Sequence, residues 1–236
     1  MIMMCYLANL GIPRSGEFLR ATALTTYEGV PFEKGFGTIV TERVIDVIML
    51  FLIIISALVL QTNFVLNYLE NYGLNLVFSL VALIIGVLGV IVLLRIIGKA
   101  KNGFLLKIKG FLDGILQGVS SILKMEDKWP FILHTLFIWA CYVGMFWAIK
   151  FVIPETAALG LSELLVAFVA GAFAMTVFPG GLGGYPVFVS AALALYGVSS
   201  NSGDAFGWVM WIAQTLMIVG LGAISFALLP LLNRNR

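Results

Sequence analysis

The chain has 236 residues, of which 61% are hydrophobic and only 11% are charged, and its formal net charge is +2. Soluble globular domains carry about 25% charged residues, so this composition excludes a soluble domain and indicates an integral membrane protein. Long apolar runs without alternating polarity exclude an outer-membrane barrel and predict an all-α, polytopic bundle of membrane helices. No nucleic-acid partner is expected.

Residues 1–36 contain no window of about 20 apolar residues, the length that a membrane span requires, so we predict a re-entrant or interfacial segment. If Ser15 to Thr26 is helical, Glu17 and Arg20 lie at i,i+3 on one face, within pairing distance. Arg14 lies one turn before Glu17. An ordinary cytoplasmic surface helix would show the same spacing, and spacing alone favours it.

The first span is predicted at 37–60, and its length sets the position of three charges. The uninterrupted apolar run Val47–Leu60 has 14 residues, or about 21 Å of helix, which is short of a hydrocarbon core of about 30 Å. A helix of about 20 residues that ends at Leu60 must therefore begin near Thr41. It then contains a charged triplet, which consists of Glu42, Arg43 and Asp46.

Two placements of this charged triplet are open. Glu42 and Asp46 are i,i+4 on one face, and Arg43 is i,i+3 from Asp46, so the arginine lowers the cost of burying all three charges. Each charge alone would cost about 2.5–3.5 kcal/mol at the membrane centre. We favour burial, because charges at membrane depth usually mark the path of a polar substrate. In the alternative, the helix continues past Gln61 and leaves the triplet at the cytosolic interface.

Three further spans are predicted at 74–97, 129–153 and 205–232. Seven of the 14 basic residues fall within 95–128, and the positive-inside rule places that segment and the C-terminus in the cytoplasm. A helical apolar stripe over 101–125 predicts an amphipathic helix on the inner leaflet, with its lysines near anionic lipids. A helix packed against the bundle would give the same stripe.

A helix-breaking stretch interrupts the apolar segment 161–198. Four glycines and two prolines fall within the nine residues Phe178–Pro186, and Gly costs about 1 and Pro about 3 kcal/mol in a helix interior. We predict a broken helix pair that meets at a wet cavity, where backbone groups find partners at membrane depth. A plain Gly-Pro kink between packed helices is the alternative. The candidate substrate-binding residues of this stretch are Pro179, Gly180, Gly181, Gly183, Gly184 and Tyr185.

The chemistry of this stretch favours binding over catalysis. It lacks the spacing of phosphate-cradling nucleotide loops. Its exposed backbone N–H groups and the positive end of the helix that starts near Pro186 would attract an anion, such as a lipid phosphate. No Ser/His/Asp, Cys/His or metal constellation appears, and Cys5 and Cys141 are expected to be packing cysteines. We therefore expect no enzymatic activity and no cofactor.

Three ordered motifs carry a resemblance to a known family. They are Asn9-Leu10-x-x-Pro13-Arg14-x-Gly16-Glu17-x-x-Arg20-Ala21, Thr41-Glu42-Arg43-x-x-Asp46 and Pro179-Gly180-Gly181-Leu182-Gly183. In this order they resemble the flippase-like transmembrane family of lysylphosphatidylglycerol synthases, the membrane half of the multiple peptide resistance factor and its stand-alone bacterial relatives. The resemblance covers essentially the whole chain and implies a domain that carries a phospholipid or lipid-linked molecule between leaflets.

Two departures from the family pattern stand out. Tyr185-Pro186 occupies the place where many relatives have an acidic residue, so no carboxylate acts there. Relatives also have further membrane helices before the first motif, so we expect a chain shortened at its N-terminus. Within the resemblance, Pro13–Arg20 would dip in from the cytoplasm and Pro179–Pro186 from outside, as inverted repeats with broken helices would.

The leading hypothesis is a flippase-like protein of the bacterial inner membrane that translocates a phospholipid or lipid-linked anionic molecule. The residues expected to hold an anionic head group are Arg14, Arg20 and Arg43. The residues expected to place these arginines, or to compensate a cationic head group, are Glu17, Glu42 and Asp46. The alternative is a scaffold that partners an envelope-building enzyme, such as a glycosyltransferase, through the 101–125 helix. Homo-oligomerisation is left open.

Overall fold

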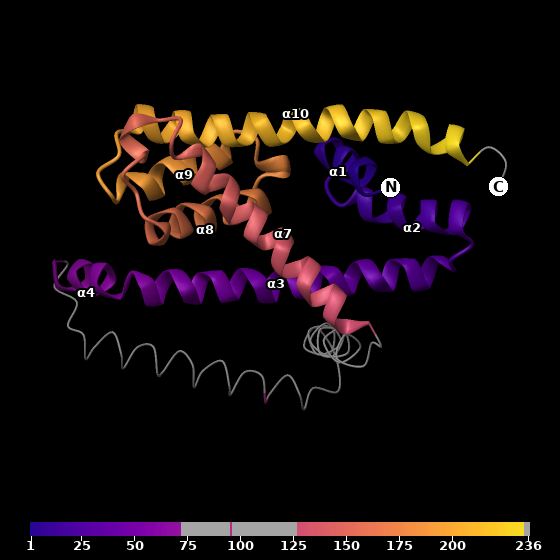
Figure 1. Ribbon diagram of the computed structural model, residues 1–236, viewed down its shortest axis with the longest axis horizontal. Helices are drawn as coiled ribbons and strands as arrows, with labels where there is room; N and C mark the ends of the chain where they lie inside the picture. The colour runs from indigo at the N-terminus through magenta and orange to yellow at the C-terminus, as the bar shows by residue number, and fades with distance from the viewer. Residues whose placement is uncertain (72–94, 96–126, 234–236) are drawn as a thin grey trace. The chain divides into compact units, whose positions relative to one another are not determined.

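The computed structural model describes residues 1–71, 95 and 127–233, and these residues form helices and turns without a strand (Figure 1). The predicted all-α fold is confirmed. In chain order the elements are α1 (Ile2–Gly11), α2 (Ser15–Glu28), α3 (Phe32–Leu60), α4 (Thr62–Asn71), α7 (Lys128–Ile149), the 3₁₀ helix η1 (Pro154–Thr156), α8 (Leu161–Val177), the 3₁₀ helix η2 (Pro179–Gly181), α9 (Gly184–Ala194) and α10 (Ser200–Leu232).

The chain divides into two compact units. The first comprises Met1–Ala57 and Trp129–Arg236, and it contains every candidate site residue. The second comprises Leu58–Lys128, in which α4 is described. The span predicted at 74–97, apart from residue 95, and the amphipathic helix predicted at 101–125 lie outside the described residues and stay predictions.

Three helices of the described chain are long and apolar enough to cross a membrane: α3, α7 and α10. They correspond to the spans predicted at 37–60, 129–153 and 205–232. The helix α3 begins at Phe32 rather than near Thr41, and its 29 residues extend about 43 Å. It ends at Leu60, and Gln61 forms a turn before α4, so the single helix continuing past Gln61 is not formed.

The C-terminal end of α7 is fixed by the buried side chain of Lys150. Only 5% of Lys150 is exposed. Its Nζ donates a hydrogen bond of 2.6 Å to the Leu159 carbonyl and lies 3.8 Å from the Trp147 ring centroid. The Thr156 hydroxyl donates to the Lys150 carbonyl at 2.9 Å. These contacts reverse the chain, so α7 stops at Ile149 instead of at residue 153.

The start of α10 is fixed by a polar contact across the following loop. Glu155 accepts hydrogen bonds from the backbone N–H and the hydroxyl of Ser199, at 2.8 and 3.0 Å. Ser199 is the N-cap of α10, and its hydroxyl oxygen accepts from the Ser202 N–H at 3.4 Å. The helix therefore begins at Ser200, five residues before the predicted 205.

The buried core of the first unit lies among α7, α8, α9 and α10. Its largest fully buried side chains include Phe146, Leu164, Leu193 and Phe206. The helices α8 and α9 pack side by side, as do α9 and α10. A Cβ added at Gly207 of α10 would lie 2.5 Å from the Pro186 Cα, so only glycine allows this close approach.

At the other end of α10, the short helix α1 packs against both α10 and α2. The α1–α2 turn is held by polar contacts: the Gly16 N–H donates to Asn9 Oδ1 at 2.8 Å, and the Ser15 hydroxyl donates to the Ile12 carbonyl at 2.7 Å. Within the predicted segment 1–36, residues 2–28 thus form a pair of helices of about 15 and 21 Å, and residues 32–36 are the start of α3. Each helix of this pair is too short to cross a hydrocarbon core of about 30 Å.

Candidate functional site

The Gly-rich stretch breaks the helix, as predicted. After α8, Phe178 is extended, with φ −102° and ψ 129°, and η2 follows. Three residues then adopt positive φ, which only glycine does without strain: Gly180 at 62°, Gly181 at 70° and Gly183 at 72°. The half-helices have 17 and 11 residues, about 26 and 17 Å, so neither alone spans a bilayer.

Trp211 of α10 holds this turn in place. Its Nε1 donates a hydrogen bond of 2.8 Å to the Gly180 carbonyl, which has left the α-helical ladder. Backbone carbonyls at membrane depth need such partners, because no water competes for them there. Sequence reasoning missed Trp211, since an indole within an apolar helix gives no signal of which distant carbonyl it will reach.

The first ion pair of the site joins two helices. Arg20 of α2 binds Glu42 of α3 with both guanidinium ends: Nη1 to Oε2 at 2.6 Å and Nη2 to Oε1 at 2.8 Å. The side chains are 19% and 32% exposed. The i,i+3 spacing had placed Glu17 within pairing distance of Arg20. The partner is Glu42 instead, because a planar guanidinium matches a carboxylate that faces it across a helix interface.

The second ion pair lies within α3 and confirms the predicted i,i+3 spacing. Arg43 Nη1 is 3.2 Å from Asp46 Oδ2, and these side chains are 52% and 41% exposed. Asp46 is the fifteenth of the 29 residues of α3, so the charges lie near the middle of the helix. This pair is open to exchange with a ligand, since exposed pairs contribute only about 0–1 kcal/mol.

Glu17 belongs to the same neighbourhood without an ion pair of its own in the described chain. Its Oε2 is buried and has no hydrogen-bond partner among the described residues. Cys5 of α1 interacts electrostatically with Glu17, Arg20, Glu42 and Arg43, which places these charges around one point of α1. The structure therefore brings together five of the six charged residues predicted for the site.

Arg14 is the charged residue that the structure leaves out. It lies in the turn between α1 and α2 with φ 66°, it is exposed, and no salt bridge within the described part of the chain involves it. A left-handed conformation is uncommon for a non-glycine residue. Its motif position marks the break between two helices rather than a contact with the other charges.

Aromatic side chains of α1 and α7 complete the neighbourhood. Tyr142 interacts with Tyr6, Asp46 and Arg43. Trp139, one turn earlier, contacts the Tyr142 ring edge-on, with centroids 5.9 Å apart. None of these aromatic residues was predicted. A Trp or Tyr at a span is usually an interface anchor, so composition alone does not distinguish a site residue.

The helix α1 contacts both parts of the candidate site. Near its middle, Cys5 and Tyr6 face the charged residues, and near its end Leu10 approaches η2, with Leu10 Cδ2 3.7 Å from the ideal Cβ position at Gly180. Contacts between α1 and η2 support the same arrangement. The charges and the broken turn are thus linked by one short helix, whose function the sequence did not reveal.

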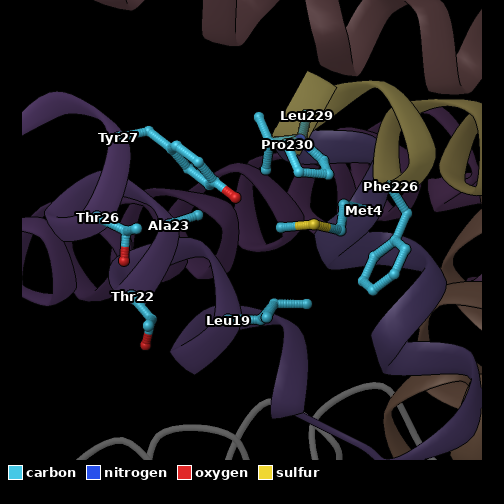
Figure 2. A pocket seen from close by; sticks show the side chains of 9 residues that line it. All are labelled: Met4, Leu19, Thr22, Ala23, Thr26, Tyr27, Phe226, Leu229 and Pro230. Carbon is cyan, nitrogen blue, oxygen red and sulfur yellow. The ribbon is translucent and has the colours of Figure 1, made fainter. Parts of the chain in front are cut away.

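A separate apolar cavity of about 230 Å³ lies among α1, α2 and α10. Figure 2 shows Met4 and Phe226 converging on it, with the Tyr27 hydroxyl also directed inward. Leu19 and Ala23 line it from α2, one residue before and three residues after Arg20. Among the described residues, no group of three or more His, Cys, Asp or Glu is placed to hold a metal ion.

These features define a helical membrane protein with several apolar spans, a broken helix and a cluster of ion pairs. Over residues 1–228 the chain matches the sequence model of one family, described as the lysylphosphatidylglycerol synthase TM region. The chain belongs to this family, and the resemblance seen in its three motifs is confirmed. Comparison with curated proteins and with solved structures gave no match.

Proposed function

We propose that this protein translocates a phospholipid or lipid-linked anionic molecule between the leaflets of the bacterial inner membrane, without covalent chemistry. One observation carries the proposal: two ion pairs and a buried carboxylate oxygen gather on α2 and α3, beside a short helix that also contacts a broken-helix turn. Charges within spans are costly, and proteins retain them where polar groups pass.

The two ion pairs are suited to different roles. The bidentate Arg20–Glu42 pair is the less exposed of the two and joins α2 to α3, so it fixes the position of one helix against the other. The Arg43–Asp46 pair is about half exposed and held by a single contact of 3.2 Å. Because a weak pair exchanges partners easily, Arg43 is the residue that would bind the head group first.

The broken turn would form the second half of the path. Positive φ at Gly180, Gly181 and Gly183 removes backbone groups from the helical ladder, and Trp211 satisfies one of the carbonyls. Backbone N–H groups at the start of α9 have no side-chain cap, and a helix end of this kind attracts anions. Transporter sites at the middle of a membrane are commonly built from such discontinuous helices.

The distribution of basic residues along the chain supports an orientation in the membrane and a class of lipid partner. We place the basic segment 95–128 and the C-terminus in the cytoplasm, with the helix predicted at 101–125 on anionic inner-leaflet lipids. The scaffold hypothesis depends on that helix, which lies outside the described residues, so no structural observation favours it over translocation.

The test is lipid movement in reconstituted vesicles. The full chain is incorporated into vesicles with a phosphatidylglycerol that carries a dye on one acyl chain, and a membrane-impermeant quencher reports dye that reaches the outer leaflet. We expect faster exposure than in empty vesicles, and a loss of about tenfold in Arg43→Gln and in Gly181→Leu, equivalent to about 1.4 kcal/mol in the barrier.

The matched control is Lys34→Gln, which removes a basic residue from an exposed position of the same helix. It should translocate at the wild-type rate. If Arg43→Gln and Gly181→Leu also match wild type, or if wild type equals empty vesicles, the proposed function is wrong.

A further inference from the structure

Beyond the charges, α7 presents a buried donor to Asp46. Trp139 is only 8% exposed, and its Nε1 is buried without a hydrogen-bond partner among the described residues. The indole lies near the Asp46 carboxylate without forming a hydrogen bond of regular geometry to it. A buried N–H left unpaired costs about 1–3 kcal/mol, so a fold retains one where a ligand or a movable group completes it.

Three donors, one from α3 and two from α7, lie near that carboxylate. Arg43 pairs with Asp46 at 3.2 Å, Tyr142 lies within electrostatic range of both of these residues, and the Trp139 indole lies near the carboxylate. A guanidinium, a phenol and an indole offer only N–H and O–H groups to an oxyanion. The three groups therefore form a site suited to an anion, and the Asp46 carboxylate is the anion that occupies it.

The Trp139 donor is held more firmly than the anion. The Trp139 ring contacts Phe168 edge-on at 6.1 Å and Tyr142 at 5.9 Å, within the buried core. Asp46, by contrast, is 41% exposed. Exchanging one carboxylate for one phosphodiester leaves the local charge unchanged, since each carries about one negative charge at neutral pH.

We propose that Arg43, Trp139 and Tyr142 form a binding site for the phosphodiester of a phospholipid, and that Asp46 occupies this site as an internal anion until the head group displaces it. The inference rests on the proposed function and assigns a class of substrate group to the same site. It adds Trp139 and Tyr142 as binding residues and makes Asp46 a competitor of the substrate rather than its partner.

The experiment measures binding, not transport. Purified full-length protein in neutral detergent is titrated with phosphatidylglycerol that carries a fluorescent acyl chain, and with diacylglycerol that carries the same chain. Glycerol phosphate is added as a soluble competitor, and thermal unfolding of each variant is recorded beside its Kd. We expect phosphatidylglycerol to bind at least about tenfold more tightly than diacylglycerol, since only it offers a charged acceptor.

Two variants move the affinity in opposite directions. Trp139→Phe keeps the ring in the core and removes the N–H, and it should weaken phosphatidylglycerol binding about tenfold. Asp46→Asn removes the internal anion and should tighten binding several-fold, a change that a merely destabilised protein would not show. Trp208→Phe, at an exposed position of α10, should leave the Kd unchanged.

The inference is overturned if Trp139→Phe binds like wild type, or if Asp46→Asn weakens binding, which would mean that Asp46 positions Arg43 for the lipid rather than competing with it. It is also overturned if glycerol phosphate competes as strongly as the lipid, which would make the ligand a soluble anion. If the protein shows the expected binding pattern but moves no lipid between the leaflets, the binding site is supported and only the proposed function is wrong.

Discussion

The guanidinium of Arg20 in α2 donates two hydrogen bonds to the carboxylate of Glu42 in α3, although the residues lie 22 positions apart in the chain. Two parallel bonds fix both distance and orientation, which a single contact does not. This pair joins the first helix pair of the chain to its first span, and it positions the more exposed Arg43–Asp46 pair beside it.

Breaking the Arg20–Glu42 pair should destabilise the protein. Glu42→Gln or Arg20→Gln leaves a partly buried charge without its partner, and we expect a loss of about 1–3 kcal/mol. Arg20→Lys should not restore stability, because an ammonium does not reproduce the bidentate geometry. Thermal unfolding in detergent micelles checks this.

The matched comparison is Asp46→Asn, which breaks the half-exposed pair and should cost less than about 1 kcal/mol. Equal losses for Glu42→Gln and Asp46→Asn would contradict the division of roles between the two pairs.

Trp211→Phe should loosen the broken turn. The substitution keeps an aromatic ring against Trp208 and removes the N–H that donates to the Gly180 carbonyl at 2.8 Å. Because the carbonyl is then left unpaired, we expect a loss of about 1–3 kcal/mol in stability. Hydrogen exchange of residues 178–185 should rise in the variant, while exchange in α3 stays as in wild type. Unchanged exchange in the turn would show that Trp211 does not hold it.

Two glycines of α10 should respond in opposite ways to the same change. Gly220 has no atom within 4 Å of its ideal Cβ position, so Gly220→Ala should stabilise the helix by up to about 1 kcal/mol. At Gly222 the added Cβ would lie 2.7 Å from Leu7 Cβ and 2.9 Å from the Met3 carbonyl, so Gly222→Ala must push α1 away from α10. Thermal unfolding of the two variants separates the effect of helix propensity from that of packing between α1 and α10. A stabilising Gly222→Ala would refute the close approach of α1.

Protonation of Glu155 should reduce stability at low pH. Hydrogen bonds from the Ser199 backbone N–H and hydroxyl hold the pKa of this carboxyl below its usual value, because they stabilise the ionised form. A lowered folded-state pKa contributes stability above the unfolded-state pKa, and that contribution is lost as pH falls through the folded-state value. Melting temperatures between about pH 6 and pH 3 should therefore fall less in Glu155→Gln than in wild type. Parallel curves for the two proteins would contradict this role.

The sequence predicted the elements whose signal is local. Gly and Pro density located the break at Phe178–Pro186, and apolar length located α3, α7 and α10. Helix ends were displaced where the determinant is a distant contact: Lys150 binds a carbonyl nine residues away, and Glu155 reaches Ser199.

The site was predicted in part for the same reason. Motif spacing indicated the charged residues and the i,i+3 pair of Arg43 with Asp46. It did not indicate that Arg20 would pair with Glu42 rather than with Glu17, because that pairing depends on how α2 packs against α3. Trp139 and Trp211 were missed, since an indole in an apolar helix has the same sequence signature whether it faces lipid or a buried acceptor.

The most direct test of the central claim is the location of the lipid head group. Vesicles are prepared with a phospholipid that carries a photoreactive group on its head, and in parallel with one that carries the group at the end of an acyl chain. After illumination, the labelled residues are mapped by mass spectrometry. We predict that the head-group probe labels the middle of α3 and α7, around Arg43, Asp46 and Tyr142, whereas the acyl probe labels exposed apolar faces. Head-group labelling confined to the ends of the spans would contradict the account.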